Sequence, residues 1–356
     1  MKLHVLNGFL GSGKTTAIQL ACLELSKKNI KASVITNDQG MKLVDSVFFK
    51  KQKIPVTQVV NGCFCCNYNK LESCIQSLVE VNQPDVIFAE TVGSCADIIA
   101  TVIKPLSQFH VDAQITFSVF ADARMLHFLL KDKQNLFEEN ITYIFFKQLE
   151  EAEIIIINKI DLIAVEQLDE LKQIVQEKYA GKILLYQNSM NEESVAQWME
   201  VLDNYKADNT LQSLEIDYDV YGAGEASLAW LDQELEIFSP VNNALQETTG
   251  LINNIYNKIR QHNFPIGHLK FILNDDTKIS FTAATGPEIS IDVRNKKMHS
   301  CHLLINARIQ TNPETLAQLI SDAIKETEKQ NDNKIVTQSI SSFRPGFPKP
   351  EYRIAN

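Results

Sequence analysis

The chain has 356 residues and a mass of 40.2 kDa, which is too long for one ordinary hydrophobic core and predicts two domains. It is 45% hydrophobic and 22% charged, as globular proteins are, and no apolar run approaches the roughly 20 residues of a membrane-spanning helix. The net charge of −10 argues against nucleic acid or an anionic membrane as the main partner, and the N-terminus lacks a signal peptide's features, so we expect a cytoplasmic protein.

The first two hundred residues alternate short β-branched apolar runs with amphipathic stretches. This pattern is typical of an α/β fold with a doubly wound, mainly parallel sheet covered by helices on both faces. Strands are expected at 2–6, 31–36, 85–89, 115–120, 153–158 and 182–186. Helices are expected at 14–28, 70–81, 123–130, 134–150 and 165–179.

The pattern changes after a polar stretch at 204–213, which marks the expected domain boundary. A long helix at 241–261 is followed by four strands, at 268–273, 278–283, 288–293 and 301–309. A last helix at 313–328 has Asn312 as its N-cap. The predicted organisation is a P-loop domain at 1–205, a smaller α+β domain at 213–329 and a proline-containing tail at 330–356, either extended over the surface or disordered.

The segment GFLGSGKT, residues 8–15, fits the G-x-x-x-x-G-K-[ST] pattern and lies between a predicted strand and a predicted helix. Its glycines allow successive backbone N–H groups to face phosphates, where the helix dipole also favours an anion. Lys14 is expected at the β- and γ-phosphates and Thr15 on Mg²⁺. The alternative is a glycine-rich turn without a ligand. The candidate nucleotide-binding residues here are Gly8, Gly11, Ser12, Gly13, Lys14, Thr15 and Thr16.

Residues 158–161, NKID, close an apolar strand at the place where P-loop GTPases carry their guanine-reading motif. Asp161 can accept hydrogen bonds from the ring and exocyclic nitrogens of guanine together, a pattern that adenine does not present. Asn158, Lys159 and Asp161 are therefore candidates for binding the base, and GTP is favoured over ATP. The alternative is a strand-end turn with a helix-capping Asp.

Glu90 follows the predicted strand at 85–89 and precedes Gly93 by three residues. In a P-loop protein this position faces the metal and the γ-phosphate. We expect Glu90 to hold Mg²⁺ through water or to orient the attacking water, and the Gly93 amide to sense the γ-phosphate. A carboxylate on a buried strand without a cation would be costly.

The motifs occur in the order Gly-x-x-Gly-x-Gly-Lys-Thr, NDQGMKLVD, NGCFCC, Glu-x-x-Gly and KQLEEAEIIIINKIDL. In this order the first two hundred residues resemble the CobW-like P-loop GTPases, a class that also holds HypB and UreG. The resemblance implies a GTPase of low intrinsic rate that couples hydrolysis to the delivery of zinc, cobalt or another divalent ion. It also makes Asp38 the switch carboxylate and catalytic candidate, where the family usually has Glu, and Asp45 the Asp that follows.

The segment between the candidate switches around Asp38 and Glu90 contains three cysteines, Cys63, Cys65 and Cys66, in a loop that also contains Gly62. Thiolates bind borderline ions, and three of them could share a tetrahedral centre at ~2.3 Å. We expect Zn²⁺ first, with Co²⁺ and Ni²⁺ open. Water, a switch carboxylate or another cysteine, with Cys95 as a candidate, could complete the shell. The alternatives are buried thiols without a metal and a redox pair of Cys63 and Cys66.

The sequence HSCH, residues 299–302, is a second metal-like cluster, but on a strand at most two of its side chains share a face. The leading hypothesis is therefore a GTP-hydrolysing metallochaperone that uses GTP, Mg²⁺ and the cysteine loop to supply a client metalloprotein or a corrinoid-pathway protein. One alternative is a regulatory GTPase with a structural zinc clip. Another is a P-loop ATPase or kinase acting on a small molecule. A homo-oligomer is compatible with the sequence.

Overall fold

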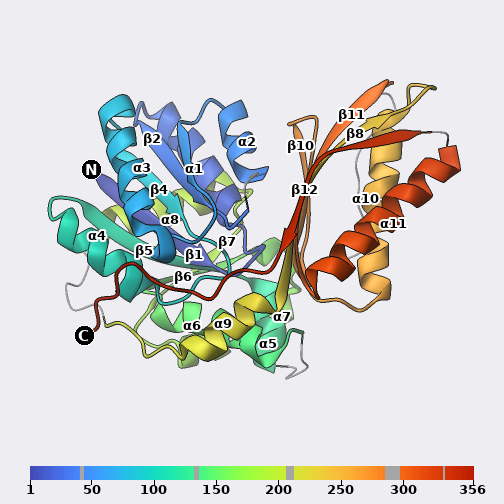
Figure 1. Ribbon diagram of the computed structural model, residues 1–356. Helices are drawn as coiled ribbons and strands as arrows, with labels where there is room; N and C mark the ends of the chain where they lie inside the picture. Colours follow the sequence, from blue (N-terminus) through green and yellow to red (C-terminus); the bar gives the residue numbers. More distant parts are fainter. Residues whose placement is uncertain (41–43, 132–135, 206–211, 285–296, 332) are drawn as a thin grey trace. The chain divides into compact units, whose positions relative to one another are not determined.

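The computed structural model in Figure 1 describes residues 1–40, 44–131, 136–205, 212–284, 297–331 and 333–356. The chain folds as two units. The first comprises 1–39, 52–224 and 347–356, and the second comprises 40–51 and 225–346. These bounds differ from the predicted division at 205, 213 and 330, because a short insertion after residue 39 joins the second unit and the last ten residues return to the first.

The first unit is built on a seven-stranded parallel sheet with the order β3-β2-β4-β1-β5-β6-β7. Its strands are β1 (Lys2–Gly8), β2 (Ala32–Asn37), β3 (Val56–Val59), β4 (Val86–Glu90), β5 (Gln114–Asp122), β6 (Ile154–Asn158) and β7 (Ile183–Gln187). The six predicted strands are confirmed. β3 was not predicted, because it is a four-residue edge strand with only one buried side chain, that of Val59. Strands such as IIIIN of β6 are buried throughout, so both faces of the sheet need helices.

Helices cover both faces of this sheet (Figure 1). They are α1 (Lys14–Lys27), α3 (Tyr68–Asn82), α4 (Lys104–Phe109), α5 (Ala123–Lys131), α6 (Glu139–Glu151), α7 (Val165–Lys178), α8 (Glu192–Asn204) and α9 (Tyr218–Ala226). The predicted helix at 134–150 begins at Glu139 instead, and residues 134 and 135 lie outside the described ranges. None of the helices within the described ranges is long and apolar enough to cross a bilayer.

The carboxyl ends of the parallel strands meet at one edge of the sheet, where ligands bind in open α/β folds. The strand order sets the loops after β3, β2, β4, β1, β5 and β6 in a row along this edge. The loop after β3 carries the cysteines, and β4 ends in Glu90. The P-loop follows β1, and the NKID motif follows β6. The topology alone therefore places all the candidate motifs on one side of the unit.

The second unit contains a five-stranded antiparallel sheet with the order β10-β9-β11-β8-β12. Its elements are α2 (Val44–Lys51), β8 (Leu228–Phe238), α10 (Ala244–Gln261), β9 (Ile266–Leu273), β10 (Thr277–Phe281), β11 (Ser300–Gln310), α11 (Pro313–Asn331) and β12 (Lys334–Phe343). The Asn312 cap is confirmed, since its side chain accepts from the Thr315 N–H at 2.7 Å. The predicted strand at 288–293 lies outside the described residues. β12 corrects the prediction of a tail from 330, because these residues form an edge strand.

The two faces of this sheet differ in character. One face packs an apolar core with α10 and α11, whereas the other carries the buried side chains of Trp230, Asp232 and Arg308. Arg308 Nη1 lies 2.8 Å from Asp232 Oδ1, and its guanidinium lies over the Trp230 ring. Phe48 of α2 packs on this second face. The insertion from the loop after β2 thus becomes part of the second unit's fold.

Candidate functional site

The P-loop is shaped by glycines in backbone conformations that other residues rarely adopt. Gly8 has a φ of 132°, and a Cβ there would lie 2.1 Å from the carbonyl oxygen of Phe120. Gly13 has a φ of 97°, and its Cβ would lie 2.3 Å from the Asn158 side chain. The turn between β1 and α1 therefore requires glycine at both positions, for conformation and for space.

The residues that follow these glycines are buried and turned toward the sheet edge. Lys14 Nζ donates to the Gly8 carbonyl at 2.6 Å. Thr15 Oγ1 donates to the Glu90 carboxylate, at 2.9 and 3.0 Å from its two oxygens. The Ser12 hydroxyl is buried and makes no hydrogen bond to any described residue. Thr16 is half-buried on α1. A hydroxyl and a carboxylate side by side, with a lysine and an unsatisfied hydroxyl nearby, fit a Mg²⁺-bound phosphate.

The NKID residues bind the P-loop from the other side. Asn158 Nδ2 donates to the Ser12 carbonyl at 2.8 Å. Lys159, in a left-handed conformation with a φ of 63°, donates to the Gly11 carbonyl and to Asp122 Oδ2. Asp161 follows in the next turn and is exposed. The motif therefore supports the P-loop with two residues and presents its carboxylate to solvent.

Asp122 ends β5 and accepts hydrogen bonds from Lys159 and from Arg124. Burial raises the pKa of this carboxyl, but the charges of Lys159 and Arg124 outweigh that effect and hold the pKa below its usual value. Asp122 is therefore an anion that orients Lys159 beneath the P-loop.

The segment after β4 lies against the P-loop. A Cβ at Gly93 would lie 2.8 Å from the Leu10 side chain and 2.9 Å from the Leu10 main-chain nitrogen. Gln148 Nε2 of α6 donates to the Gly93 and Cys95 carbonyls at 3.1 and 2.8 Å. Asn7 Nδ2 donates to the Cys95 carbonyl as well, at 3.1 Å. Buried amides thus fix the path from Glu90 to Cys95.

The cysteine loop is held by side-chain amides. Gly62 has a φ of 141° and lies against the Asn67 side chain. Asn37, the last residue of β2, donates to the carbonyls of Val59 and Gly62 at 3.0 and 2.8 Å and accepts from the Phe64 N–H at 2.8 Å. The end of β2 therefore fixes the entry into the cysteine loop, and Asp38 follows it directly.

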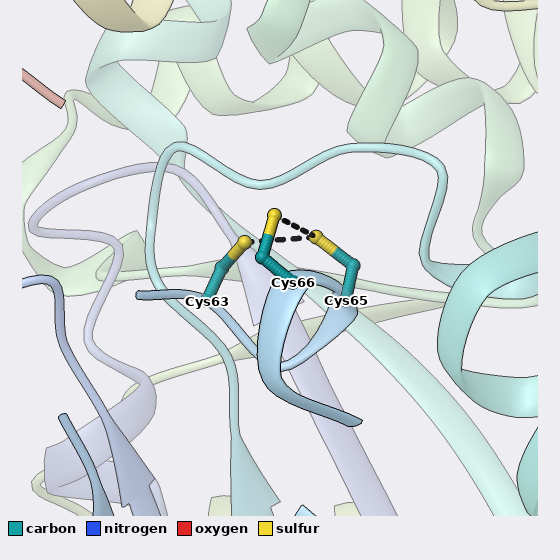
Figure 2. A group of neighbouring side chains, drawn as sticks. All are labelled: Cys63, Cys65 and Cys66. Carbon is teal, nitrogen blue, oxygen red and sulfur yellow. Dashed lines mark hydrogen bonds between the residues drawn. The ribbon is translucent and has the colours of Figure 1, made fainter. Parts of the chain in front are cut away.

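The three thiols converge (Figure 2). Cys63 Sγ and Cys65 Sγ are 2.8 Å apart, and Cys65 Sγ and Cys66 Sγ are 3.7 Å apart. Within the described ranges, only this trio brings three such ligand atoms within 4.8 Å of one another. Tetrahedral coordination at ~2.3 Å requires sulfurs about 3.8 Å apart. The Cys65–Cys66 pair matches this spacing, and Cys63 would have to move out by about 1 Å.

Cys95 lies near this group. It is 1% exposed, and its thiol interacts electrostatically with those of Cys63 and Cys65, although it lies outside the group of three ligand atoms within 4.8 Å of one another. Hydrogen bonds from the three other thiols lower the pKa of Cys63 well below its usual value. The hydrogen bond with Cys63 raises the pKa of Cys65 well above it and that of Cys66 to about 12. The cluster therefore favours one thiolate, at Cys63, with thiols around it as donors, and a divalent cation would displace the remaining protons.

Asp38, Asp45 and the HSCH residues make no described contact with the P-loop or with the cysteine trio. The Asp38 N–H donates to the Val59 carbonyl at 3.2 Å, and the Asp45 side chain lies outside the described residues. In HSCH, Cys301 is buried, His299 is exposed, and His302 lies 3.0 Å from Glu234 Oε1. These residues form no three-ligand group in the described part of the chain.

The structure adds Asn7, Asn37, Asp122 and Gln148 to the site, none of which was singled out from the sequence. Asn37 opens the NDQG motif, and Gln148 lies within KQLEE, so both occur inside segments already noted for other reasons. Asp122 could have been suspected as a carboxylate at the end of an apolar strand.

Comparison with known proteins gives a family. The model of a family described as CobW/HypB/UreG, nucleotide-binding domain, matches residues 2–185. Zinc chaperone YeiR of Escherichia coli is 28% identical over 186 residues, 51% of this chain and 54% of that protein. Zinc chaperone CobW of Sinorhizobium is 30% identical over 200 residues, 50% of this chain and 56% of that protein. Zinc-regulated GTPase metalloprotein activator 1 of Dictyostelium discoideum is 25% identical over 207 residues, 49% of this chain and 43% of that protein. The match thus spans about half the length of these relatives.

Proposed function

The chain belongs to the CobW/HypB/UreG family, and on this basis we propose that it is a GTP-hydrolysing metallochaperone. It binds a divalent ion at Cys63, Cys65 and Cys66 and releases it to a client metalloprotein under control of the nucleotide. Two relatives are named zinc chaperones and a third is named a zinc-regulated GTPase. These names favour zinc over cobalt and nickel as the cargo.

The nucleotide roles follow from the contacts at the P-loop. Lys14 binds the β- and γ-phosphates, exchanging its Gly8 carbonyl for phosphate oxygens. Thr15 and Glu90 hold Mg²⁺, directly or through water, and the ion supplies positive charge to the phosphates when bound. Asp161 reads the guanine edge. Asp38 is the switch carboxylate, on the strand end next to Glu90 in the sheet.

One observation carries the coupling between nucleotide and metal. The segment from Gly93 to Cys95 contacts the P-loop at Leu10 through its first residue, and the thiol of its last residue, Cys95, interacts electrostatically with those of Cys63 and Cys65. The cysteine loop follows β3 and the P-loop follows β1, three strand positions away, or about 14 Å. A γ-phosphate that binds the Gly93 amide therefore acts on a segment that also carries a thiol of the metal site.

We propose Cys95 as the fourth zinc ligand, which it becomes if its segment moves toward the trio. With Cys95 bound, zinc has a closed shell of four thiolates, and without it the shell holds three thiolates and an exchangeable position. If the nucleotide moves the segment from Gly93 to Cys95, the number of protein ligands on the zinc ion changes. We expect the closed shell to retain the ion and the open shell to hand it on.

The test is zinc affinity in two nucleotide states, measured by competition with a chromophoric chelator. The wild-type protein should bind one zinc ion, with at least a tenfold difference in Kd between GDP and a non-hydrolysable GTP analogue. A Cys63→Ser/Cys65→Ser/Cys66→Ser variant should lose this binding. Cys22→Ser, which alters a buried cysteine of α1, is the control and should bind as the wild type does. Co²⁺ serves as an optical probe, and Cys95→Ser should weaken its thiolate charge-transfer band in one nucleotide state.

Three outcomes would contradict the proposal. Unchanged zinc content in the triple variant would place the metal elsewhere. Equal zinc affinity with GDP and with the analogue would leave a GTPase with a structural zinc clip, whose output is protein binding alone. Preference for ATP in the same titrations would indicate a P-loop ATPase or kinase.

A further inference from the structure

The segment 348–354, called the strap here, binds across the cysteine loop. The main-chain N–H of Lys349 donates to Cys66 Sγ at 3.2 Å. The N–H of Glu351 donates to the Cys65 carbonyl at 2.9 Å, and its carboxylate accepts from the Asn69 N–H at 2.8 Å, in the first turn of α3. An acidic side chain at a helix N-terminus is favoured by the exposed N–H groups there. The strap is thus joined to the cysteine loop at two points and to the first turn of α3 at a third.

The strap also binds the segment that carries Cys95. Arg353 Nε donates to Asp97 Oδ2 at 2.7 Å, and Asp97 is 1% exposed. The Ile354 N–H donates to the Ala100 carbonyl at 2.9 Å. Tyr352 lies edge-on against the Tyr68 ring, with centroids 5.2 Å apart. The strap therefore links the two segments that together provide the four thiols.

Within the strap, the group that reaches the thiols belongs to the main chain. The Lys349 side chain is exposed, whereas Pro348 before it is buried beside Gly222 of α9. Residue 350 is also a proline, which favours an extended backbone at Lys349. The N–H is consequently held at the sulfur by its neighbours, without help from the Lys349 side chain.

A backbone N–H directed at a ligating sulfur stabilises the thiolate and fixes its direction. Cys66 benefits most, because it is half-buried whereas Cys63 and Cys65 are 3% and 1% exposed. The strap provides a donor to the one thiol of the three that solvent can reach.

We propose that the strap is part of the metal site, with the Lys349 amide as a positioning group for Cys66, and that it sets how firmly the ion is retained. This rests on the proposed function, in which Cys66 ligates the cargo. Transfer of the ion to a client then requires the strap to leave Cys66, so the client competes with residues 348–354 for this side of the thiols.

The decisive comparison is between Lys349→Pro and Lys349→Ala. Proline removes the N–H and keeps the extended backbone, whereas alanine removes the exposed side chain and keeps the N–H. In the 356-residue chain, Lys349→Pro should raise the Kd for Zn²⁺ by about 10- to 100-fold and speed zinc dissociation into excess chelator. Lys349→Ala should stay within about twofold of the wild type. GDP affinity should be unchanged in both, which shows that the nucleotide domain is folded.

A second variant covers the case in which Lys349→Pro loses GDP binding. Arg353→Gln releases the far end of the strap from Asp97 and leaves the Lys349 N–H in place. It should accelerate zinc dissociation several-fold. The role of the strap would be overturned if Lys349→Pro and Lys349→Ala had equal zinc affinities and zinc dissociation rates. If the proline variant is unfolded, an unchanged zinc dissociation rate in Arg353→Gln would overturn it. Either result would leave the cysteine site intact. A wild-type protein that binds no zinc would overturn both.

Discussion

The P-loop after β1 and the cysteine loop after β3 lie on the same edge of one sheet, yet different groups hold them. Charged groups support the P-loop, through Lys14 and Lys159 on its own carbonyls and Thr15 on Glu90. Neutral amides support the cysteine loop, chiefly Asn37 and the main chain of Lys349. A phosphate at the P-loop competes for the lysines, whereas the amides that support the cysteine loop lie three strand positions away from it. Nucleotide binding should therefore remodel the first loop and reach the second only through Gly93 and Cys95.

Glycine substitutions provide the largest test of this difference. Gly8→Ala should lower the free energy of unfolding by more than about 4 kcal/mol, because its Cβ would meet main-chain atoms of Phe120 on the neighbouring strand. Gly62→Ala should cost only about 2 kcal/mol, because its Cβ would meet the end of the Asn67 side chain, which can shift. Urea unfolding followed by circular dichroism measures both.

Gly181→Ala is the control for these variants. Gly181 also has a positive φ, 88°, but a Cβ there meets nothing within 4 Å, so only the backbone conformation is penalised, by about 1 kcal/mol. If Gly62→Ala proved as costly as Gly8→Ala, the cysteine loop would be as rigidly enclosed as the P-loop, and the contrast between them would fail.

Asn37→Ala is expected to affect the cysteine loop alone. It removes three hydrogen bonds to Val59, Gly62 and Phe64 and should cost about 3 kcal/mol of stability. Zinc affinity should fall, because the loop loses its fixed entry, while GDP affinity should stay the same. Chelator competition and a GDP titration measure the two effects.

The matched control lies on the same strand. Ser33 is 1% exposed, and its hydroxyl makes no hydrogen bond to any described residue, so Ser33→Ala should leave both affinities and the stability nearly unchanged. A parallel loss of GDP binding in Asn37→Ala would show that the amide supports both loops.

Asp161→Asn is the corresponding test of the nucleotide side. In the proposed function the carboxylate accepts hydrogen bonds from two N–H groups of guanine, and the amide of the variant would present a donor in place of one acceptor. GTP affinity should fall about 100-fold, or roughly 2.7 kcal/mol, and xanthosine triphosphate, with a carbonyl in place of the exocyclic amine, should gain. Zinc affinity without nucleotide should not change, because Asp161 lies on the far side of the P-loop from the cysteines in the strand order. Unchanged GTP affinity would remove Asp161 from the site.

The sequence predicted the nucleotide side better than the metal side, for a physical reason. Gly8 to Thr15 and Asn158 to Asp161 are contiguous motifs next to apolar strands, so their local pattern determines their position. The supports of the cysteine loop are distant along the chain. Phe64 and Asn37 are 27 residues apart, and Lys349 and Cys66 are 283 residues apart. A hydrogen bond from a main-chain N–H leaves no trace in residue identity, so nothing in KPEYRI indicated a strap.

The fold shows the same limit. The buried strands of the parallel sheet and the amphipathic helices α1, α3 and α7 were predicted from their periodicity, whereas the long and largely buried strand β8 was not predicted. The edge strands β3 and β12 were missed, because half-exposed residues such as Gln58 and Ser339 lack a clear apolar pattern. The insertion 40–51 joins the second unit through contacts such as that of Phe48 with Ile272, which only the tertiary structure provides.

The two regions should also respond to pH in opposite directions, which is the smallest effect expected. Beside the P-loop, the pKa of Asp122 is below its usual value, since the charges of Lys159 and Arg124 outweigh burial. Its contribution to stability is full above about pH 4, the value in the unfolded chain, and is lost as the pH falls through the folded pKa. Asp122→Asn should therefore flatten the acid limb of the stability profile.

Near Cys95, stability should change with pH in the opposite direction, through Glu151. Glu151 is buried, and burial together with the charge of Asp97 raises its pKa well above the usual value. Between about pH 4.5, where the unfolded chain releases this proton, and the folded pKa, stability should fall by about 1.4 kcal/mol per pH unit from this group. Glu151→Gln should remove that slope and leave the protein more stable than the wild type above neutral pH. Thermal unfolding of the wild type, Asp122→Asn and Glu151→Gln from pH 3 to 9 measures both effects. A wild-type profile that Glu151→Gln does not alter would mean that this carboxyl is already ionised in the fold, so that the segment behind Cys95 carries a charge, as the P-loop does.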